Sequence, residues 1–150
     1  MSNARWKRGN GHGSVDRCAQ ARLAATLPRS GARALPPPPD VATLAGDPDL
    51  QDIVVLNLSR ALQICVDLAL HTLSILGQPV PDTMGQAFDQ LAGAGRLPAG
   101  LALRLKNAVG FRNIAVHNYG AIDWAIVHAI ATRHLGDFEA FARAISQDQV

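Results

Sequence analysis

The chain has 150 residues, is 48% hydrophobic and carries a formal net charge of +2. This size is typical of a single domain with enough apolar content to bury a core. The charge is uneven, because residues 1–40 hold seven of the 14 Lys and Arg residues but only two of the 12 Asp and Glu residues. Residues 41–150 are therefore mildly acidic, which excludes nucleic-acid binding driven by overall charge. Such binding requires the N-terminal segment or a local basic cleft around Arg104, Lys106 and Arg112.

The two cysteines, Cys18 and Cys65, have no spacing typical of metal ligands, so a structural zinc site is not expected. We expect no metal and no cofactor, and this cysteine usage fits a reducing compartment. No apolar run is long and charge-free enough to span a bilayer, and arginines interrupt the N-terminal Ala/Leu stretch. These features predict a cytoplasmic protein without a signal peptide and without membrane contact.

The first quarter of the chain is rich in Gly, Pro and Arg and ends in the run Pro36–Pro39, which favours an extended polyproline conformation. Ser14 can cap a short helix that reaches Leu27. We therefore predict that residues 1–40 form a basic segment that is poorly structured or short-helical. Residues 41–150 form the predicted helical domain.

A long helix is predicted from Pro48 to about Leu76. Asp47 is a suitable N-cap, Pro48 is favoured at the first helical position, and Gly77 ends the helix. Asp52 complements the positive end of the helix dipole. The helix is apolar on nearly all sides, so part of its cover is expected from a second subunit. Its polar residues form one narrow stripe at intervals of three or four: Asn57, Arg60, Gln63, Asp67, His71 and Ser74.

The stripe has two interpretations. It is either a solvated face without a function or one wall of an active cleft. In the second case Asp67 and His71, which are four residues apart, can hydrogen-bond each other and orient a substrate or the catalytic groups. Asp67 and His71 are therefore candidate accessory residues.

Further helices follow the long one. The predicted starts are a capping box of Thr83 with Gln86, a helix that begins near Pro98, a helix that Asp123 caps, and a last helix with Phe138, Phe141 and Ile145 at helical spacing. No alternation of period two has a useful length anywhere. The fold class is therefore all-α, most simply an up-and-down bundle of four or five helices.

The segment Arg112–Tyr119, with the sequence RNIAVHNY, places several polar side chains in an otherwise apolar stretch. Arginine is almost never fully buried without a partner, and histidine moves its proton near neutral pH. Arg112 and His117 therefore offer a fixed cation and a proton carrier, the minimum for cleaving a phosphodiester without a metal. Asn113, four residues before His117, can hold the imidazole in one tautomer.

The order Arg, four residues, His, one residue, Tyr, with Asn directly after Arg, resembles the signature of the HepT-like toxins, a branch of the HEPN superfamily of all-helical ribonucleases. Residues 56–91 and 119–145 are similar to the helices that flank this motif in the family. The resemblance implies a homodimeric, metal-independent endoribonuclease toxin whose substrate is RNA, with Arg112 and His117 as catalytic residues and Asn113 as their orienting residue. It also implies a MntA-type nucleotidyltransferase antitoxin as partner, which transfers AMP to Tyr119.

Helix geometry constrains the motif. At about 100° per residue, Arg112 and His117 point about 140° apart, whereas Arg112 and Tyr119 are nearly aligned. Convergence on one phosphate requires the helix to end or kink near Asn118, or a second copy of the motif across a two-fold axis. Tyr119 is either the modified residue or a side chain that packs at the helix end with its hydroxyl in water.

Two other functions stay open from the sequence. One is a non-catalytic HEPN module that only docks on a nucleotidyltransferase. The other is a helical protein that serves for dimerisation alone. Neither of them needs Arg112 and His117 to be placed for catalysis.

Overall fold

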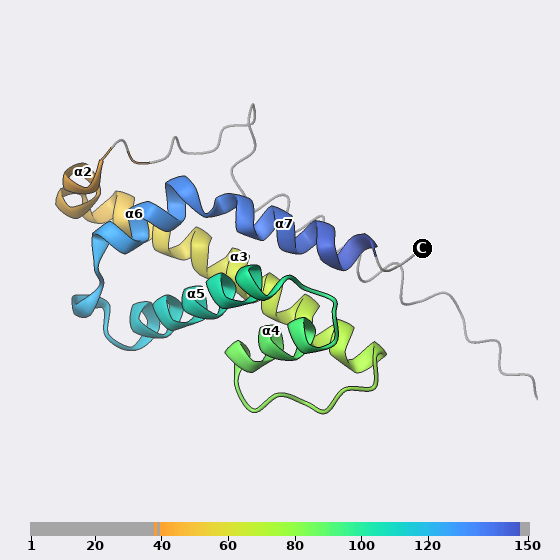
Figure 1. Cartoon of the computed structure of the whole chain (residues 1–150). Helices are drawn as coiled ribbons and strands as arrows, with labels where there is room; N and C mark the ends of the chain where they lie inside the picture. The colour runs from red at the N-terminus through yellow and green to blue at the C-terminus, as the bar shows by residue number, and fades with distance from the viewer. Residues whose placement is uncertain (1–37, 39, 148–150) are drawn as a thin grey trace, which may run out of the picture.

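The computed structural model describes residue 38 and residues 40–147 (Figure 1). The predictions made for residues 1–37 therefore lie outside the described residues. These contain helices and no strand, which confirms the all-α prediction. The elements are α2 (Val41–Gly46), α3 (Pro48–Ile75), α4 (Met84–Gly93), α5 (Ala99–His117), the 3-10 turn η1 (Tyr119–Ala121), α6 (Trp124–Arg133) and α7 (Leu135–Ser146).

The short helix α2 is not predicted by the sequence pattern. Asp40 caps it by accepting a hydrogen bond from the backbone N–H of Thr43 at 2.6 Å. The buried side chain of Gln51, on α3, donates hydrogen bonds to the carbonyl oxygens of Leu44 and Ala45, both at 2.9 Å. Satisfied buried polar groups thus fix the last turn of α2 to the beginning of α3.

The long helix α3 begins and ends as predicted. Asp47 Oδ1 accepts a hydrogen bond from the backbone N–H of Leu50 at 3.1 Å, and Pro48 occupies the first turn. Gly77 follows the helix with a φ of 67°, a conformation that glycine adopts without the strain of a side chain. Both ends of α3 are therefore set by residues next to the helix in the sequence.

Helix α3 is the centre of the core and crosses the whole domain in Figure 1. Its apolar buried residues are Val55, Leu58, Ala61, Leu62, Cys65, Val66, Leu68, Ala69 and Leu73. Phe88 of α4 and Phe141 of α7 are also buried, and their rings meet edge to face with centroids 5.7 Å apart. The predicted apolar spacing of the last helix therefore does place Phe141 in the core.

The same helix corrects one expectation about membranes. By length and composition, Pro48–Ile75 is apolar enough to cross a bilayer, whereas no such run is predicted from the sequence. Its buried side chains pack against the other helices of the domain. Core packing accounts for most of this apolar composition, although Ile53, Leu56, Leu70 and Ile75 stay exposed.

The topology brings the end of α5 to the beginning of α3. Residues 76–83 lead back along the bundle, so α4 runs in the same direction as α3, and α5 runs in the opposite direction (Figure 1). Helix α4 begins at the predicted cap, where Thr83 Oγ1 accepts a hydrogen bond from the backbone N–H of Gln86 at 3.2 Å. Helices α6 and α7 follow each other with a break at His134.

Candidate active site

The predicted motif lies at the C-terminal end of α5. The helix includes both Arg112 and His117 and ends there, because Asn118 has φ −150° and ψ 68°, outside the helical region. The backbone N–H of Asn118 still donates to the carbonyl oxygen of Ile114 at 2.8 Å. The helix therefore ends near Asn118, as one of the two predicted alternatives requires.

This end does not by itself bring the two catalytic candidates together. Arg112 and His117 belong to one uninterrupted helix, so they still point about 140° apart. Helix geometry alone therefore does not aim both side chains at one point, and the second predicted alternative, a facing copy of the motif, stays a prediction.

Arg112 is half-buried over the beginning of α4. Its Nη1 lies 3.4 Å from the sulfur of Met84, which is a weak acceptor. Its Nε is buried and has no hydrogen-bond partner within the described part of the chain. A buried donor left in this way costs about 1–3 kcal/mol, which an anionic ligand can recover by accepting the hydrogen bond.

His117 and Asn113 are both exposed, and between these two described residues the structure has no hydrogen bond. The His117 ring is therefore accessible to a ligand at the last turn of α5. The role of Asn113 in holding one tautomer stays a prediction.

Tyr119 is placed differently from the expectation. Because the helix ends before it, Tyr119 is not on the helical face of Arg112, and its hydroxyl is not simply in water. The Tyr119 Oη donates a hydrogen bond to Asp52 Oδ1 of α3 at 2.8 Å, and the side chain remains 41% exposed. Its ring meets that of Trp124 at a centroid distance of 5.8 Å.

The surroundings of the Tyr119 hydroxyl change its acidity. Loss of solvent, followed by the hydrogen bond to Asp52 and the negative charge of that carboxylate, raises the pKa of Tyr119 to about 12. All three causes disfavour the phenolate. At neutral pH the hydroxyl is therefore protonated and held by the carboxylate.

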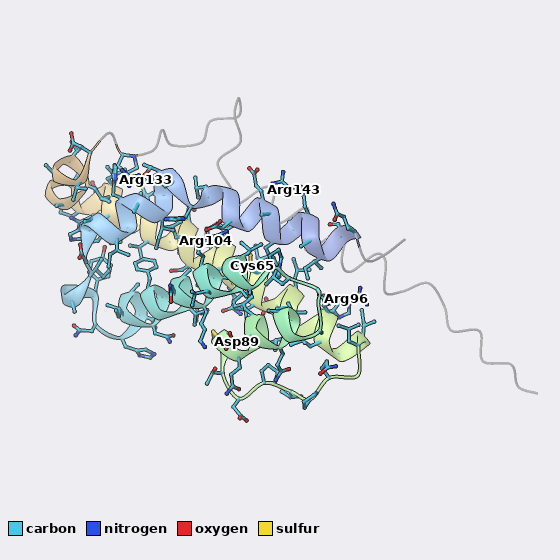
Figure 2. All side chains as sticks on the ribbon, in the orientation of Figure 1. Cys65, Asp89, Arg96, Arg104, Arg133 and Arg143 are labelled. Atoms are coloured by element: carbon cyan, nitrogen blue, oxygen red, sulfur yellow. The ribbon has the colours of Figure 1, made fainter. Side chains whose placement is uncertain are left out.

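The other two cations of the predicted basic cleft are already neutralised. Arg104 Nε contacts both carboxylate oxygens of Asp137 at 3.0 Å, and Lys106 Nζ contacts Asp89 Oδ2 at 2.7 Å. Figure 2 labels Arg104 on α5 and Asp89 on α4. Of the three residues, Arg112 alone lacks a carboxylate partner among the described residues. The expected cleft of three available cations is thus reduced to one.

Asp67 and His71 lie elsewhere on α3. The Asp67 carboxylate is exposed and accepts a hydrogen bond from Gln63 Nε2 at 2.8 Å. Asp67 follows Asp52, the partner of Tyr119, by fifteen residues, which is roughly 22 Å along a helix axis. The distance separates Asp67 from Tyr119, and the accessory role of Asp67 and His71 stays a prediction.

Two neighbours of the motif are not predicted to lie at the site. From the sequence, Asp52 is interpreted only as a charge near a helix start, and Met84 is assigned no role. Their contacts with Tyr119 and Arg112 join residues 67 and 28 positions apart. No local spacing signals such pairs, because the packing of α3, α4 and α5 creates them.

Known proteins are similar in sequence to most of this chain. The family model for the HepT-like ribonucleases matches residues 37–145. The mRNA nuclease HepT of Shewanella oneidensis is 37% identical over 99 residues, which are 66% of this chain and 74% of that protein.

Two solved structures extend the comparison to the fold. One is a tri-AMPylated Shewanella oneidensis HEPN toxin in complex with an MNT antitoxin, whose matched chain has a TM-score of 0.68 and 30% identity, over 91% of this chain and 94% of that one. The other is a toxin–antitoxin with AMP-PNP, with a TM-score of 0.66 and 29% identity, over 89% of this chain and 94% of that one. With a family match that spans most of its length, the chain belongs to the HepT-like ribonuclease family.

Proposed function

We propose that this chain is the toxin of a toxin–antitoxin pair and that it cleaves RNA in the cytoplasm as a metal-independent endoribonuclease. Arg112 and His117 are the proposed catalytic residues, and Asn113 is the proposed orienting residue of the His117 imidazole. One observation carries the proposal: Arg112 keeps a buried Nε without a hydrogen-bond partner in the described residues, five positions before the exposed His117 on the same helix. Family membership and the similarity to an mRNA nuclease support RNA as the substrate.

The proposed reaction uses the 2′-hydroxyl of RNA as the nucleophile. A base takes the 2′-hydroxyl proton while the oxygen attacks the adjacent phosphorus. The bond from phosphorus to the 5′-oxygen then breaks, and an acid protonates that leaving oxygen. Histidine suits both roles because its proton moves near neutral pH, and the Arg112 guanidinium stabilises charge on the phosphoryl oxygens.

The proposed active form is a homodimer. Each motif supplies one histidine, and the reaction needs a base and an acid. Two facing motifs supply both, together with two arginines. The uninterrupted helix between Arg112 and His117 supports this arrangement, as do the exposed apolar side chains at this end of the domain: Ile53, Leu56, Ile114 and Val116.

Control of the toxin is proposed to act on Tyr119. A MntA-type nucleotidyltransferase antitoxin transfers AMP from ATP to the phenolic oxygen, and the added phosphate and nucleoside obstruct RNA at the end of α5. The exposure of Tyr119 and the AMPylated state of the similar Shewanella oneidensis toxin support this role. Tyr119 is also the only tyrosine in the chain, so the site of modification is unambiguous.

A nuclease assay with excess chelator tests the proposal. We expect cleavage of RNA that persists without free divalent metal and stops after treatment with the nucleotidyltransferase and ATP. Tyr119→Phe keeps the ring but lacks the acceptor oxygen, so it should cleave RNA and escape this inhibition. A chain that binds the nucleotidyltransferase but never cleaves RNA is instead the non-catalytic HEPN module. A chain that does neither is the dimerisation protein.

A further inference from the structure

The hydrogen bond between Tyr119 and Asp52 is a contact that the proposed function does not explain. The Tyr119 Oη donates to Asp52 Oδ1 at 2.8 Å across two elements, η1 and α3, that are distant in the sequence. Both residues are exposed, so the oxygen and the carboxylate can be reached together from solvent. A second protein's active site can therefore approach this pair without unfolding the bundle.

Transfer of AMP to Tyr119 requires that its hydroxyl lose a proton. A phenol attacks phosphorus well only as its proton leaves, and the pKa of Tyr119 is raised to about 12. On the order of one molecule in 10⁵ would carry the phenolate at pH 7. Spontaneous ionisation is therefore a poor route to the nucleophile, and a proton acceptor within hydrogen-bond reach of Oη supplies a better one.

We propose that Asp52 is this acceptor: its carboxylate takes the Tyr119 proton as the phenolic oxygen attacks the α-phosphorus of a nucleoside triphosphate. The O–H bond breaks, a bond forms between Tyr119 Oη and the α-phosphorus, and the bond from that phosphorus to the bridging oxygen breaks. Pyrophosphate leaves, and the proton stays on Asp52 until solvent takes it. The step rests on the proposed modification of Tyr119 and assigns to the toxin a catalytic residue of its own inactivation.

The geometry distinguishes Asp52 from its neighbours. Asp52 is the charged residue that acts on the Tyr119 hydroxyl, both through the hydrogen bond and through its field. The other close neighbour of the ring, Trp124, is uncharged. Asp49 lies in the first turn of the same helix, is also exposed, and has no hydrogen bond to Tyr119. Asp49 therefore provides a matched control of equal charge.

The test follows AMP incorporation into the full-length chain by the cognate nucleotidyltransferase with ATP and magnesium. Intact and peptide mass spectrometry give the rate of AMP addition at Tyr119 between about pH 6 and pH 9. In the wild type we expect a nearly flat rate, because Tyr119 passes its proton directly to the Asp52 carboxylate and does not have to ionise first. Asp52→Asn keeps the size and an acceptor oxygen but cannot take the proton. We expect it to react about 100-fold or more slowly at pH 7, with a rate that rises about tenfold per pH unit.

Asp49→Asn should react as the wild type does, and thermal melting should show that both variants are folded. Asp52→Asn with the wild-type rate overturns the inference. A slower Asp52→Asn that keeps the flat pH profile also overturns it, because Asp52 is then only a positioning residue. If the wild type takes no AMP at Tyr119, the proposed regulation itself fails, and the step fails with it.

Discussion

The cationic side chains in the middle of α5 and the one at its end have different kinds of partner. In the middle, Arg104 and Lys106 each contact a carboxylate of a neighbouring helix, at 3.0 and 2.7 Å. At the end, Arg112 rests on the sulfur of Met84, and no described carboxylate accepts its protons. Basic residues therefore form ion pairs between helices in the middle of α5, whereas the one at its end remains available for an anion.

This difference indicates which of these cations can contribute to the binding of an anion. Partly exposed ion pairs contribute only about 0–1 kcal/mol to stability, but they neutralise the charge that a phosphate would seek. A guanidinium with a buried, unsatisfied Nε costs stability and gains most when an anion arrives. We therefore expect substitutions at the end of α5 to affect function and substitutions in the core to affect folding.

The largest effect is expected at the motif. Arg112→Ala and His117→Ala should each lower RNA cleavage about 100-fold or more, because each removes a group with a proposed catalytic role, charge stabilisation by Arg112 and proton transfer by His117. Neither variant should melt below the wild type, since neither side chain fills the core and Arg112→Ala also removes the buried, unsatisfied Nε. Initial rates of RNA cleavage and circular dichroism measure both effects. Arg104→Ala is the matched control on the same helix, and it should keep its cleavage rate.

A mixture of the two inactive variants sharpens this comparison. If residues of both subunits build each site, chains with Arg112→Ala and chains with His117→Ala should recover part of the activity after they are mixed. Light scattering under the assay conditions gives the oligomeric state. An active monomer would refute the composite site, and an unfolded His117→Ala would identify His117 as a structural residue.

The core should respond in the opposite way. Phe88 is 0% exposed and faces Phe141, so Phe88→Ala should lower the free energy of unfolding by about 3–5 kcal/mol. Val80 is 87% exposed, and Val80→Ala should change the free energy of unfolding by less than about 0.5 kcal/mol. Urea unfolding followed by circular dichroism measures both values. Equal stability of the two variants would contradict the described core.

The smallest effect is a shift in the titration of Tyr119. The ultraviolet absorbance of the phenolate should show a midpoint of about 12, since this chain has one tyrosine and its pKa is raised. Asp52→Asn removes the negative charge and should move this pKa down, towards the ordinary value of about 10. The sign for stability follows: the contact stabilises the fold fully below about pH 10, and this contribution is lost as the pH rises towards 12. An unchanged midpoint in the variant would contradict the contact.

Local features of the fold are predicted well from the sequence. Helices α3, α4 and α6 each begin at a predicted capping residue, whose side chain accepts a hydrogen bond from a backbone N–H in the first turn. The acceptor is Asp47 for the N–H of Leu50, Thr83 for that of Gln86 and Asp123 for that of Ala125. The buried positions Phe138, Phe141 and Ile145 follow from helical spacing alone. Such features need no knowledge of how the helices pack.

The candidate site is predicted only in part. The order of Arg112, His117 and Tyr119 in the motif is readable because it is local. The partners of these residues are not, because Asp52 and Met84 reach them through the packing of separate helices. The alignment of Tyr119 with Arg112 is wrong because it assumes a helix through Asn118, where the backbone turns away.

The contact between Tyr119 and Trp124 gives the site its own optical reporter. The two rings lie 5.8 Å apart, so an adenylyl group on Tyr119 must alter the surroundings of the indole. The chain has one other tryptophan, Trp6, which can be changed to phenylalanine to leave Trp124 as the single indole emitter. The emission of Trp124 should then follow modification of the toxin continuously, without a label.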